Sequence, residues 1–236
     1  MFEELDYRVT PIGAISLRRR RDLRLGQDVL EIKLGDEFLM SSHFTASEIA
    51  LARLGLAEVR SPAPDVVVGG LGLGYTAAAV LEDPRVASLR VVDLLDAVID
   101  WHREGLIPLG PVLTADPRCR LQQGDFFALA ASETGFDPDR PGRTLDAILV
   151  DIDHAPDFLL DQGSAGFYTA EGLAALTRHL KPGGVFGLWS DAPPDAAFTD
   201  RLAGVYAEAR AEPVVFDNPY LGDTVTQTVY LARAAG

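Results

Sequence analysis

The stretch Val66-Val67-Val68-Gly69-Gly70-Leu71-Gly72-Leu73-Gly74-Tyr75-Thr76 decides the fold. Its valines form a short buried strand, and the glycines after them lead directly into a helix rich in alanine. Gly70, Gly72 and Gly74 have no Cβ atom, so they permit a tight turn and let a ligand approach the backbone amides. Those amides lie at a helix N-terminus, whose partial positive charge suits a phosphate or a carboxylate. We therefore expect an adenosine-type cofactor at this turn, with Gly69, Gly70, Gly72 and Gly74 as binding residues.

Short apolar strands alternate with helices from Asp65 onward, which indicates a parallel sheet covered on both faces. The expected strands are Val66–Val68, Leu89–Asp93, Arg120–Gln122, Ala147–Val150, Val185–Trp189, Val214–Phe216 and Thr224–Leu231. Helices are expected at about 75–82, 97–105, 126–132, 169–180 and 195–210. The pattern predicts an α/β protein of the Rossmann-like type.

The N-terminal part has a different pattern, with short strands up to about residue 42. A helix then begins near Thr45, where Thr45-Ala46-Ser47-Glu48 has the form of a capping box. The prolines of Ser61-Pro62-Ala63-Pro64 end this unit. We expect two domains: residues 1–60 form a β-strand domain plus a linking helix, and residues 61–236 form the cofactor-binding catalytic domain.

Charge and composition exclude several classes of partner. The chain has 236 residues, with 21 lysines and arginines against 35 aspartates and glutamates, a formal net charge of −14. An acidic surface repels nucleic acid and anionic lipid. Cys119 is the one cysteine and the four histidines are scattered, so we expect no disulfide and no metal. No stretch resembles a signal peptide or a membrane span, which favours a cytoplasmic enzyme. The basic run Arg18–Arg21 is expected at a strand edge.

Asp93 ends the second predicted strand of the parallel sheet, 19 residues after Gly74. An acidic residue at this spacing accepts hydrogen bonds from the hydroxyls of a ribose. The alternative is that Asp93 caps the helix that follows, although Asp96 is better placed for that role. We expect Asp93 to bind ribose.

Gly124, Asp125 and Phe126 follow the third predicted strand. A carboxylate here can accept from an adenine amino group, with the ring of Phe126 or Phe127 beside the base. The alternative is that Asp125 only caps the next helix.

Asp151, Asp153 and His154 come directly after the fourth predicted strand. The carboxyl ends of parallel strands border the ligand crevice, so these three residues are the catalytic candidates. Asp151 serves either as a general base or as a group that orders its loop. His154 is either a base that titrates near neutral pH or an incidental loop residue. Residues 152–166 form a long connection that is a candidate lid.

These blocks resemble the spermidine synthase-like branch of the class I S-adenosylmethionine-dependent methyltransferase superfamily. The resemblance covers roughly Asp65 to Ala232, and its most characteristic part is Phe167-Tyr168-Thr169 leading to Leu180-Lys181-Pro182-Gly183-Gly184-Val185. It implies a seven-stranded class I methyltransferase sheet with the last strand antiparallel and a small N-terminal β-rich domain that often mediates dimerisation. It also implies Asp93 on the ribose, Asp125 near the adenine and Asp151 as the base that takes a proton from an attacking amine.

The sequence departs from the family at three places. Aminopropyltransferases carry an aspartate inside the glycine turn, where it holds the aminopropyl ammonium of decarboxylated S-adenosylmethionine. The turn here has Leu71 and Leu73 and is closer to an ordinary methyltransferase turn. His154 stands where the family has a second aspartate, with Asp153 one position early. Of the family's N-terminal Tyr-His-Glu constellation, His43 and Glu48 remain in a comparable stretch.

We therefore expect a homodimeric transferase that moves a group from S-adenosylmethionine or decarboxylated S-adenosylmethionine to a small acceptor, an amine or another nucleophile. Methyl transfer is favoured over aminopropyl transfer because the turn has no carboxylate. Three alternatives remain open. They are a true aminopropyltransferase of the spermidine synthase kind, a nicotinamide oxidoreductase, and a catalytically silent nucleoside-binding module.

Overall fold

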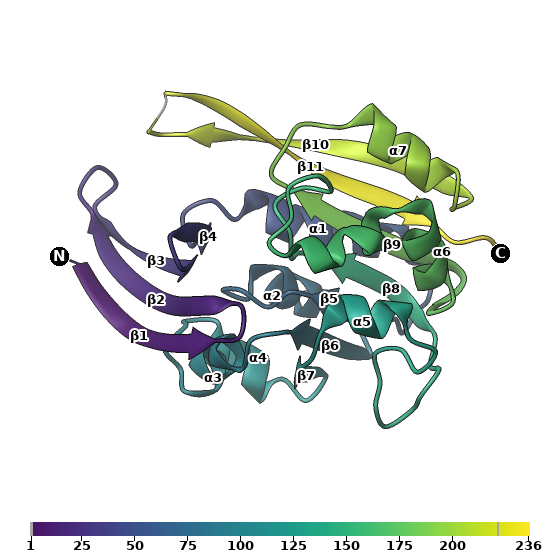
Figure 1. The fold of residues 1–236 in the computed structure, drawn as a ribbon, viewed down its shortest axis with the longest axis horizontal. Helices are drawn as coiled ribbons and strands as arrows, with labels where there is room; N and C mark the ends of the chain where they lie inside the picture. The colour runs from purple at the N-terminus through teal and green to yellow at the C-terminus, as the bar shows by residue number, and fades with distance from the viewer. Residues whose placement is uncertain (1, 221) are drawn as a thin grey trace.

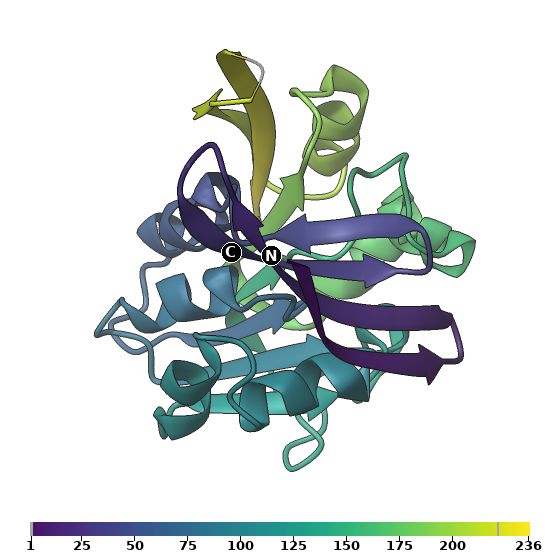
Figure 2. The same cartoon turned by 90° about the vertical axis from the view of Figure 1, so that its left-hand side faces the viewer.

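The computed structural model describes residues 2–220 and 222–236 and contains two β-sheets (Figure 1). The smaller sheet is antiparallel, with its strands in chain order: β1 (Phe2–Thr10), β2 (Gly13–Asp22), β3 (Gln27–Leu34) and β4 (Glu37–Ser41). In Figure 2 this sheet lies in front of the rest of the molecule.

The larger sheet has seven strands in the order β10-β11-β9-β8-β5-β6-β7. They are β5 (Asp65–Gly69), β6 (Ser88–Asp93), β7 (Cys119–Gln123), β8 (Leu145–Val150), β9 (Leu180–Ser190), β10 (Glu208–Asn218) and β11 (Asp223–Arg233). Strands β7, β6, β5, β8 and β9 are parallel, and β11 runs antiparallel to both of its neighbours. The expected seven-stranded sheet with an antiparallel last strand is confirmed. Because β5 lies between β6 and β8, the chain changes direction across the sheet there, and a ligand crevice is expected at its carboxyl end.

Helices cover both faces of the larger sheet. They are α1 (Ala46–Glu58), α2 (Tyr75–Leu81), α3 (Asp96–Arg103), α4 (Gly110–Ala115), α5 (Phe126–Ala131), α6 (Ala170–Thr177), α7 (Ala196–Ala203) and the 3-10 helix η1 (Gln162–Tyr168). Val66 and Val68 of β5 join one core with α1 to α4, while Val67 joins a second core with α5 to α7. Successive strand residues point to opposite faces, so a strand between two helical layers is apolar throughout.

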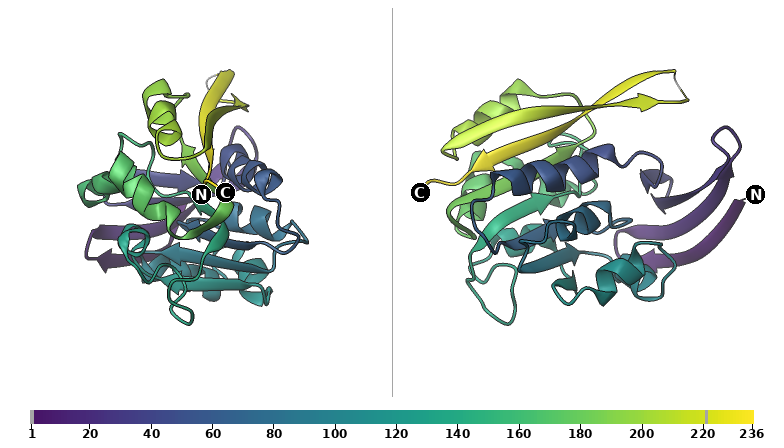
Figure 3. Two further views of the ribbon diagram at one scale, coloured as in Figure 1. Left: turned by 90° about the vertical axis from the view of Figure 1, so that its right-hand side faces the viewer. Right: turned by 180° about the vertical axis from the view of Figure 1, so that it is seen from behind.

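Helix α1 packs on the larger sheet, as the rear view in Figure 3 shows. A Cβ atom on Gly55 would collide with Leu149 of β8, and Leu51 lies against Gly187 of β9. The helix that we grouped with residues 1–60 as a linking helix thus packs on the larger sheet, and the expected division into two domains stays a prediction. None of the helices in the described ranges is long and apolar enough to cross a membrane.

The predicted capping box at the start of α1 is wrong. The side chain of Thr45 makes no capping hydrogen bond, and Glu48 is buried, with 6% of its surface exposed. The side chains of Ser47 and Glu48 in the first turn are buried and contact each other, and the hydroxyl of Ser47 also contacts Gln227 of β11.

Two further expectations are corrected. The helix expected at 195–210 ends at Ala203, because residues from Glu208 onward pair with β11 as strand β10. Arg18–Arg21 do not lie on an edge strand, since β2 is paired on both sides. Each of these arginines instead forms an ion pair with a carboxylate on its own or a neighbouring strand.

Candidate active site

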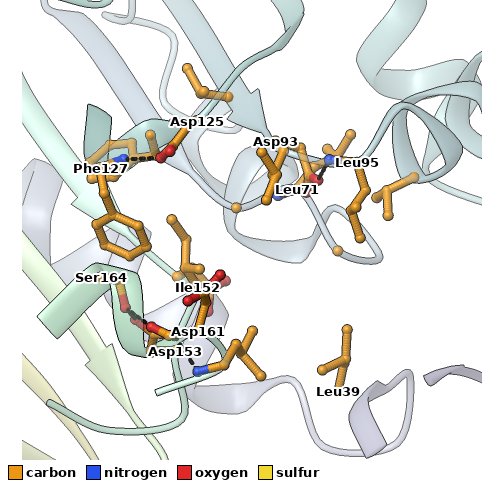
Figure 4. A pocket seen from close by; sticks show the side chains of 18 of the residues that line it. Leu39, Leu71, Asp93, Leu95, Asp125, Phe127, Ile152, Asp153, Asp161 and Ser164 are labelled. Carbon is orange, nitrogen blue, oxygen red and sulfur yellow. Dashed lines mark hydrogen bonds between the residues drawn. The ribbon is translucent and has the colours of Figure 1, made fainter. Parts of the chain in front are cut away.

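A cavity of about 560 Å³ lies at the carboxyl ends of β5, β6 and β8. One wall is the glycine turn and the strand ends of the larger sheet. The opposite wall belongs to the small sheet and consists of Ile12, Ile32, Leu34, Leu39 and Met40. Figure 4 shows part of this space, with Leu39 across the cavity from Asp93 and Leu71. The volume is typical of a site for a cofactor or other small molecule.

The glycine turn has the tight geometry that its sequence predicts. Gly70 and Gly72 line the cavity with φ values of 90° and 47°, a region that favours glycine. A Cβ atom on Gly70 would overlap the carbonyl oxygen of Asp151, and one on Gly72 would overlap the sulfur of Met40. Gly69 and Gly74 do not line the cavity; a Cβ atom on Gly69 would collide with the ring of Phe126, and Gly74 is the N-cap of α2.

Asp93 joins the turn to the next helix. Its carboxylate accepts hydrogen bonds from the amide of Leu71 at 2.9 Å and the amide of Leu95 at 2.8 Å. Burial raises the pKa of Asp93, and the bonds from the amides of Leu95, Leu71 and Gly72 oppose that rise. The expected ribose contact and the alternative role at the helix start are therefore compatible. A carboxylate has about four lone-pair positions, so acceptor capacity remains on the cavity side.

Asp125 faces the cavity from the start of α5 (Figure 4). One of its oxygens accepts from the amides of Phe127 and Ala128, so the capping role is confirmed, and the residue lines the cavity as well. Gly124 lies behind the cavity wall and donates its amide hydrogen to the carbonyl of Asp93 at 2.9 Å. Phe126 is buried and stacks on Phe136, with an edge on the cavity.

Asp151 and Glu48 form a pair of carboxyl groups in the lining of the cavity. Asp151, at the end of β8, accepts a hydrogen bond of 2.6 Å from the hydroxyl of Thr76. Burial raises the pKa of Asp151 to about 6. Burial, and then the charge of Asp151, raise the pKa of Glu48 to about 8. At neutral pH the two carboxyl groups therefore share one negative charge and one proton.

The chain was compared with known proteins by sequence. No protein-family model matches it. Putrescine N-methyltransferase 3 of Nicotiana tabacum is 28% identical over 136 residues, which cover 57% of this chain and 32% of that protein. Putrescine N-methyltransferase 1 of Nicotiana attenuata is 29% identical over 139 residues, which cover 57% of this chain and 31% of that protein. The chain spans about a third of the length of these curated relatives.

Solved structures give a broader match. A spermidine synthase in complex with the transition state analogue AdoDATO superimposes with a TM-score of 0.73 and 17% identity, covering 98% of this chain and 73% of the other. The spermidine synthase from Thermotoga maritima superimposes with a TM-score of 0.72 and 18% identity, covering 98% of this chain and 72% of that one. The chain has the spermidine synthase fold. On this fold, the small sheet forms one wall of the cavity and the larger sheet forms the other.

Asp153 is satisfied by the protein itself. It is buried and accepts from the amide of Leu160 at 2.7 Å, the hydroxyl of Tyr168 at 2.7 Å and the hydroxyl of Ser164 at 3.2 Å. These bonds fix the segment 152–166, which roofs the cavity and contributes Ile152, Leu160, Asp161, Gly163 and Ser164 to its lining. Asp153 also lines the cavity, and its expected catalytic role stays a prediction.

His154 lies at the cavity wall between two acidic side chains. Its Nε2 atom is 3.5 Å from Glu37 of the small sheet, and its Nδ1 atom is 3.6 Å from Asp191. The ring also stacks on Phe158, with 5.1 Å between centroids. His154 thus links the roof segment to both walls of this spermidine synthase fold.

Glu48, Met40 and Tyr75 are among the lining residues that the sequence candidates did not include. Glu48 was interpreted as a helix-capping residue, and Met40 and Tyr75 carry no signal of their own. Glu48 could have been found from its place in the family's N-terminal constellation. Trp189 of β9 also lines the cavity. No lysine or arginine does so among the residues that the structure describes, so the charged groups of the lining are acidic and suit a cation.

Proposed function

We propose that this chain is a transferase that uses an S-adenosylmethionine-type sulfonium cofactor and a small amine acceptor. The observation that carries the proposal is that the Glu48–Asp151 pair opens into the same cavity as the glycine turn and Asp93. The residues present fit the cofactor, because Asp93 retains acceptor capacity for a ribose and the lining is acidic around a cationic sulfonium. The amine acceptor agrees with relatives named putrescine N-methyltransferases.

Asp151 takes the proton of the acceptor. An ammonium group has no lone pair, so transfer to an amine requires that one N–H proton first pass to a base. Asp151 is held by Thr76 with its carboxylate in the cavity, which suits it to receive that proton. When bound, the cofactor supplies an electrophilic carbon on a sulfonium sulfur that leaves as a neutral thioether. The roof segment 152–166 limits access of water to that group.

Methyl transfer is the leading reaction. An aminopropyl donor carries a terminal ammonium, and the turn offers Leu71 and Leu73 where a carboxylate would hold it. Uncharged side chains at this place suit a cofactor whose reactive group is a methyl.

Aminopropyl transfer from decarboxylated S-adenosylmethionine is the second candidate, and a specific observation favours it. The amide of Leu71 is bonded to Asp93, and the amide of Leu73 lies 3.0 Å from the sulfur of Met40. With no basic side chain among the described lining residues, the carboxylate of intact S-adenosylmethionine would find few donors.

Calorimetry with the two cofactors, followed by mass spectrometry of putrescine incubated with each, tests the proposal. We expect intact S-adenosylmethionine to bind and putrescine to gain one methyl group. Binding and transfer only with the decarboxylated cofactor would establish the second candidate. Binding of neither would overturn the proposal, and binding without transfer to any amine would indicate a silent module. The variant Asp93→Ala is the control, since loss of the carboxylate should weaken the binding of both cofactors equally. A fluorescence change with NADH would favour the oxidoreductase.

A further inference from the structure

Ser47 connects Glu48 to two elements of the larger sheet. The hydroxyl of this fully buried serine lies 2.9 Å from an oxygen of Glu48, its neighbour in α1. It also lies 2.5 Å from the side-chain oxygen of Gln227 on β11, and it accepts a hydrogen bond of 2.8 Å from the indole of Trp189 on β9. Three elements thus place hydrogen-bonding groups around one hydroxyl.

Counting protons around Ser47 fixes the state of Glu48. An indole N–H only donates and a serine hydroxyl has a single hydrogen, so Ser47 accepts from Trp189 and donates once. The amide oxygen of Gln227, at the shorter distance, takes that hydrogen. The contact between Ser47 and Glu48 then needs a hydrogen from Glu48, which only the protonated carboxylic acid has.

The other groups around Glu48 agree with a neutral acid. Asp151 faces it from the end of β8, and Tyr75 faces it from α2. Burial, and then the negative charge of Asp151, raise the pKa of Glu48, whereas a hydrogen bond with Ser47 lowers it. Burial, and then the charge of Glu48, raise the pKa of Tyr75. The hydroxyl of Thr76 lies 2.6 Å from the carboxylate of Asp151, and its longer contact of 3.2 Å is with the backbone carbonyl of Glu48 rather than with its carboxyl group.

We propose that Ser47, Gln227 and Trp189 form a relay that keeps the proton on Glu48, so that Asp151 alone carries negative charge toward the acceptor amine. This inference rests on the proposed function for the identity of the acceptor. A second ionised carboxylate would hold the acceptor as an ammonium and oppose the loss of its proton. With Glu48 neutral, the proton that leaves the amine nitrogen passes to Asp151. Ser47, Gln227 and Trp189 are positioning residues that act through Glu48.

The variants Gln227→Leu and Gln227→Glu test the relay in opposite directions. Leucine fills the site without an acceptor, so Ser47 turns its hydrogen to Glu48 and stabilises the carboxylate. We expect the ionisation midpoint of Glu48 to fall by about one pH unit. Glutamate retains an acceptor and adds negative charge, so the midpoint should stay or rise. The measurement is a ¹³C NMR titration of glutamate carboxyl groups in the unliganded chain, with Glu48→Gln identifying the signal. Thr226→Ala, on the opposite face of β11, is the control and should change nothing.

An unchanged or raised midpoint in Gln227→Leu would overturn the relay, because the amide would then be donating to Ser47. The titration needs no substrate, so its outcome is separate from the fate of the proposed function. Kinetics supply a second readout that a merely structural role would not give. Because a larger fraction of Glu48 is ionised at neutral pH in Gln227→Leu, the acceptor should bind more tightly but give up its proton less readily, so both KM and kcat should fall. A rise in KM with an unchanged kcat would contradict the relay.

Discussion

At the scale of single residues, the cavity places two carboxyl groups where each disfavours ionisation of the other. Glu48 comes from the first turn of α1 and Asp151 from the end of β8, so the pair forms only when the helix packs on the sheet. Thr76 orients Asp151 and Ser47 contacts Glu48. Different hydrogen-bond partners support the different roles that we propose for these two similar side chains, Asp151 as base and Glu48 as neutral acid.

Asp151→Asn should abolish most transfer while leaving the cofactor site intact. The amide cannot accept a proton at neutral pH, and we expect the single-turnover rate to fall about 10²–10⁴-fold. Cofactor affinity by calorimetry should change little, because Asp93 and the glycine turn are untouched. A variant that retained full transfer would show that another group is the base.

Glu48→Gln should remove part of the pH dependence of stability. The folded chain keeps a proton on Glu48 up to pH about 8, whereas the unfolded chain releases it near 4.5. Folding therefore takes up a proton in this window, and the free energy of unfolding falls as pH rises through it, by about 2–4 kcal/mol. Glutamine mimics the neutral acid and should flatten that fall. Urea unfolding of the unmodified chain and of Glu48→Gln at pH 5 and pH 8 measures the change in unfolding free energy between the two pH values. An equal change in the two proteins would contradict the assignment.

At the scale of elements, the roof of the cavity depends on one buried carboxylate. Asp153 binds the backbone at Leu160 and the hydroxyls of Ser164 and Tyr168, which span the segment from the end of β8 into η1. The hydroxyl of Tyr168 is buried and donates to Asp153 at 2.7 Å. These bonds act together with the packing of Ile152 and Leu159 against the core.

Asp153→Ala should loosen this roof and destabilise the chain. The change leaves the buried Tyr168 hydroxyl without its acceptor, which costs about 1–3 kcal/mol. We expect faster proteolytic cleavage within 152–166 and weaker cofactor binding. The matched control is Asp157→Ala in the same segment, where the side chain is exposed and the change should be within about 0.5 kcal/mol. Equal protease resistance in the two variants would show that Asp153 does not hold the roof.

At the scale of the whole molecule, the small sheet is docked on the larger unit by polar contacts. The indole of the fully buried Trp101 donates to Asp6 of β1 at 2.6 Å, and Arg8 forms ion pairs with Asp6 and Asp100. The bond from Trp101, followed by Arg8, lowers the pKa of Asp6. This contribution to docking is therefore present above the ordinary pKa of an aspartate and is lost as pH falls through the lowered value.

Asp6→Ala should weaken docking of the small sheet and, with it, the cofactor site. The indole N–H of Trp101 would be left buried without an acceptor, which costs about 1–3 kcal/mol. Because the small sheet supplies a full wall of the cavity, cofactor affinity should fall although Asp6 is not a lining residue. Glu3→Ala, which removes an exposed ion pair with Arg19, is the control. Unchanged affinity in Asp6→Ala would show that the wall holds without this contact.

The expected homodimer stays a prediction.

Local sequence patterns predicted most of the larger sheet and the cofactor end of the site. Strand β5, the glycine turn and Asp93 are close together in the chain and obey spacing rules that hold whatever the rest of the protein does. The residues after Ala203 were assigned to a helix because their pattern is ambiguous. Pairing with β11 makes part of them a strand, which shows tertiary context overriding local preference.

What the sequence by itself determined is the order of strands and helices, the tight turn at Gly70 and Gly72, and the carboxylates at the strand ends. These features depend on backbone sterics and on the alternation of side chains along a strand, and residues close together in the sequence determine both. Tertiary structure alone decided three things. Glu48 turns inward toward Asp151, Asp153 accepts hydrogen bonds from the roof segment and Tyr168, and the small sheet forms one wall of the cavity. The protonation and partners of a buried polar group depend on atoms brought from distant parts of the chain, and no local pattern records them.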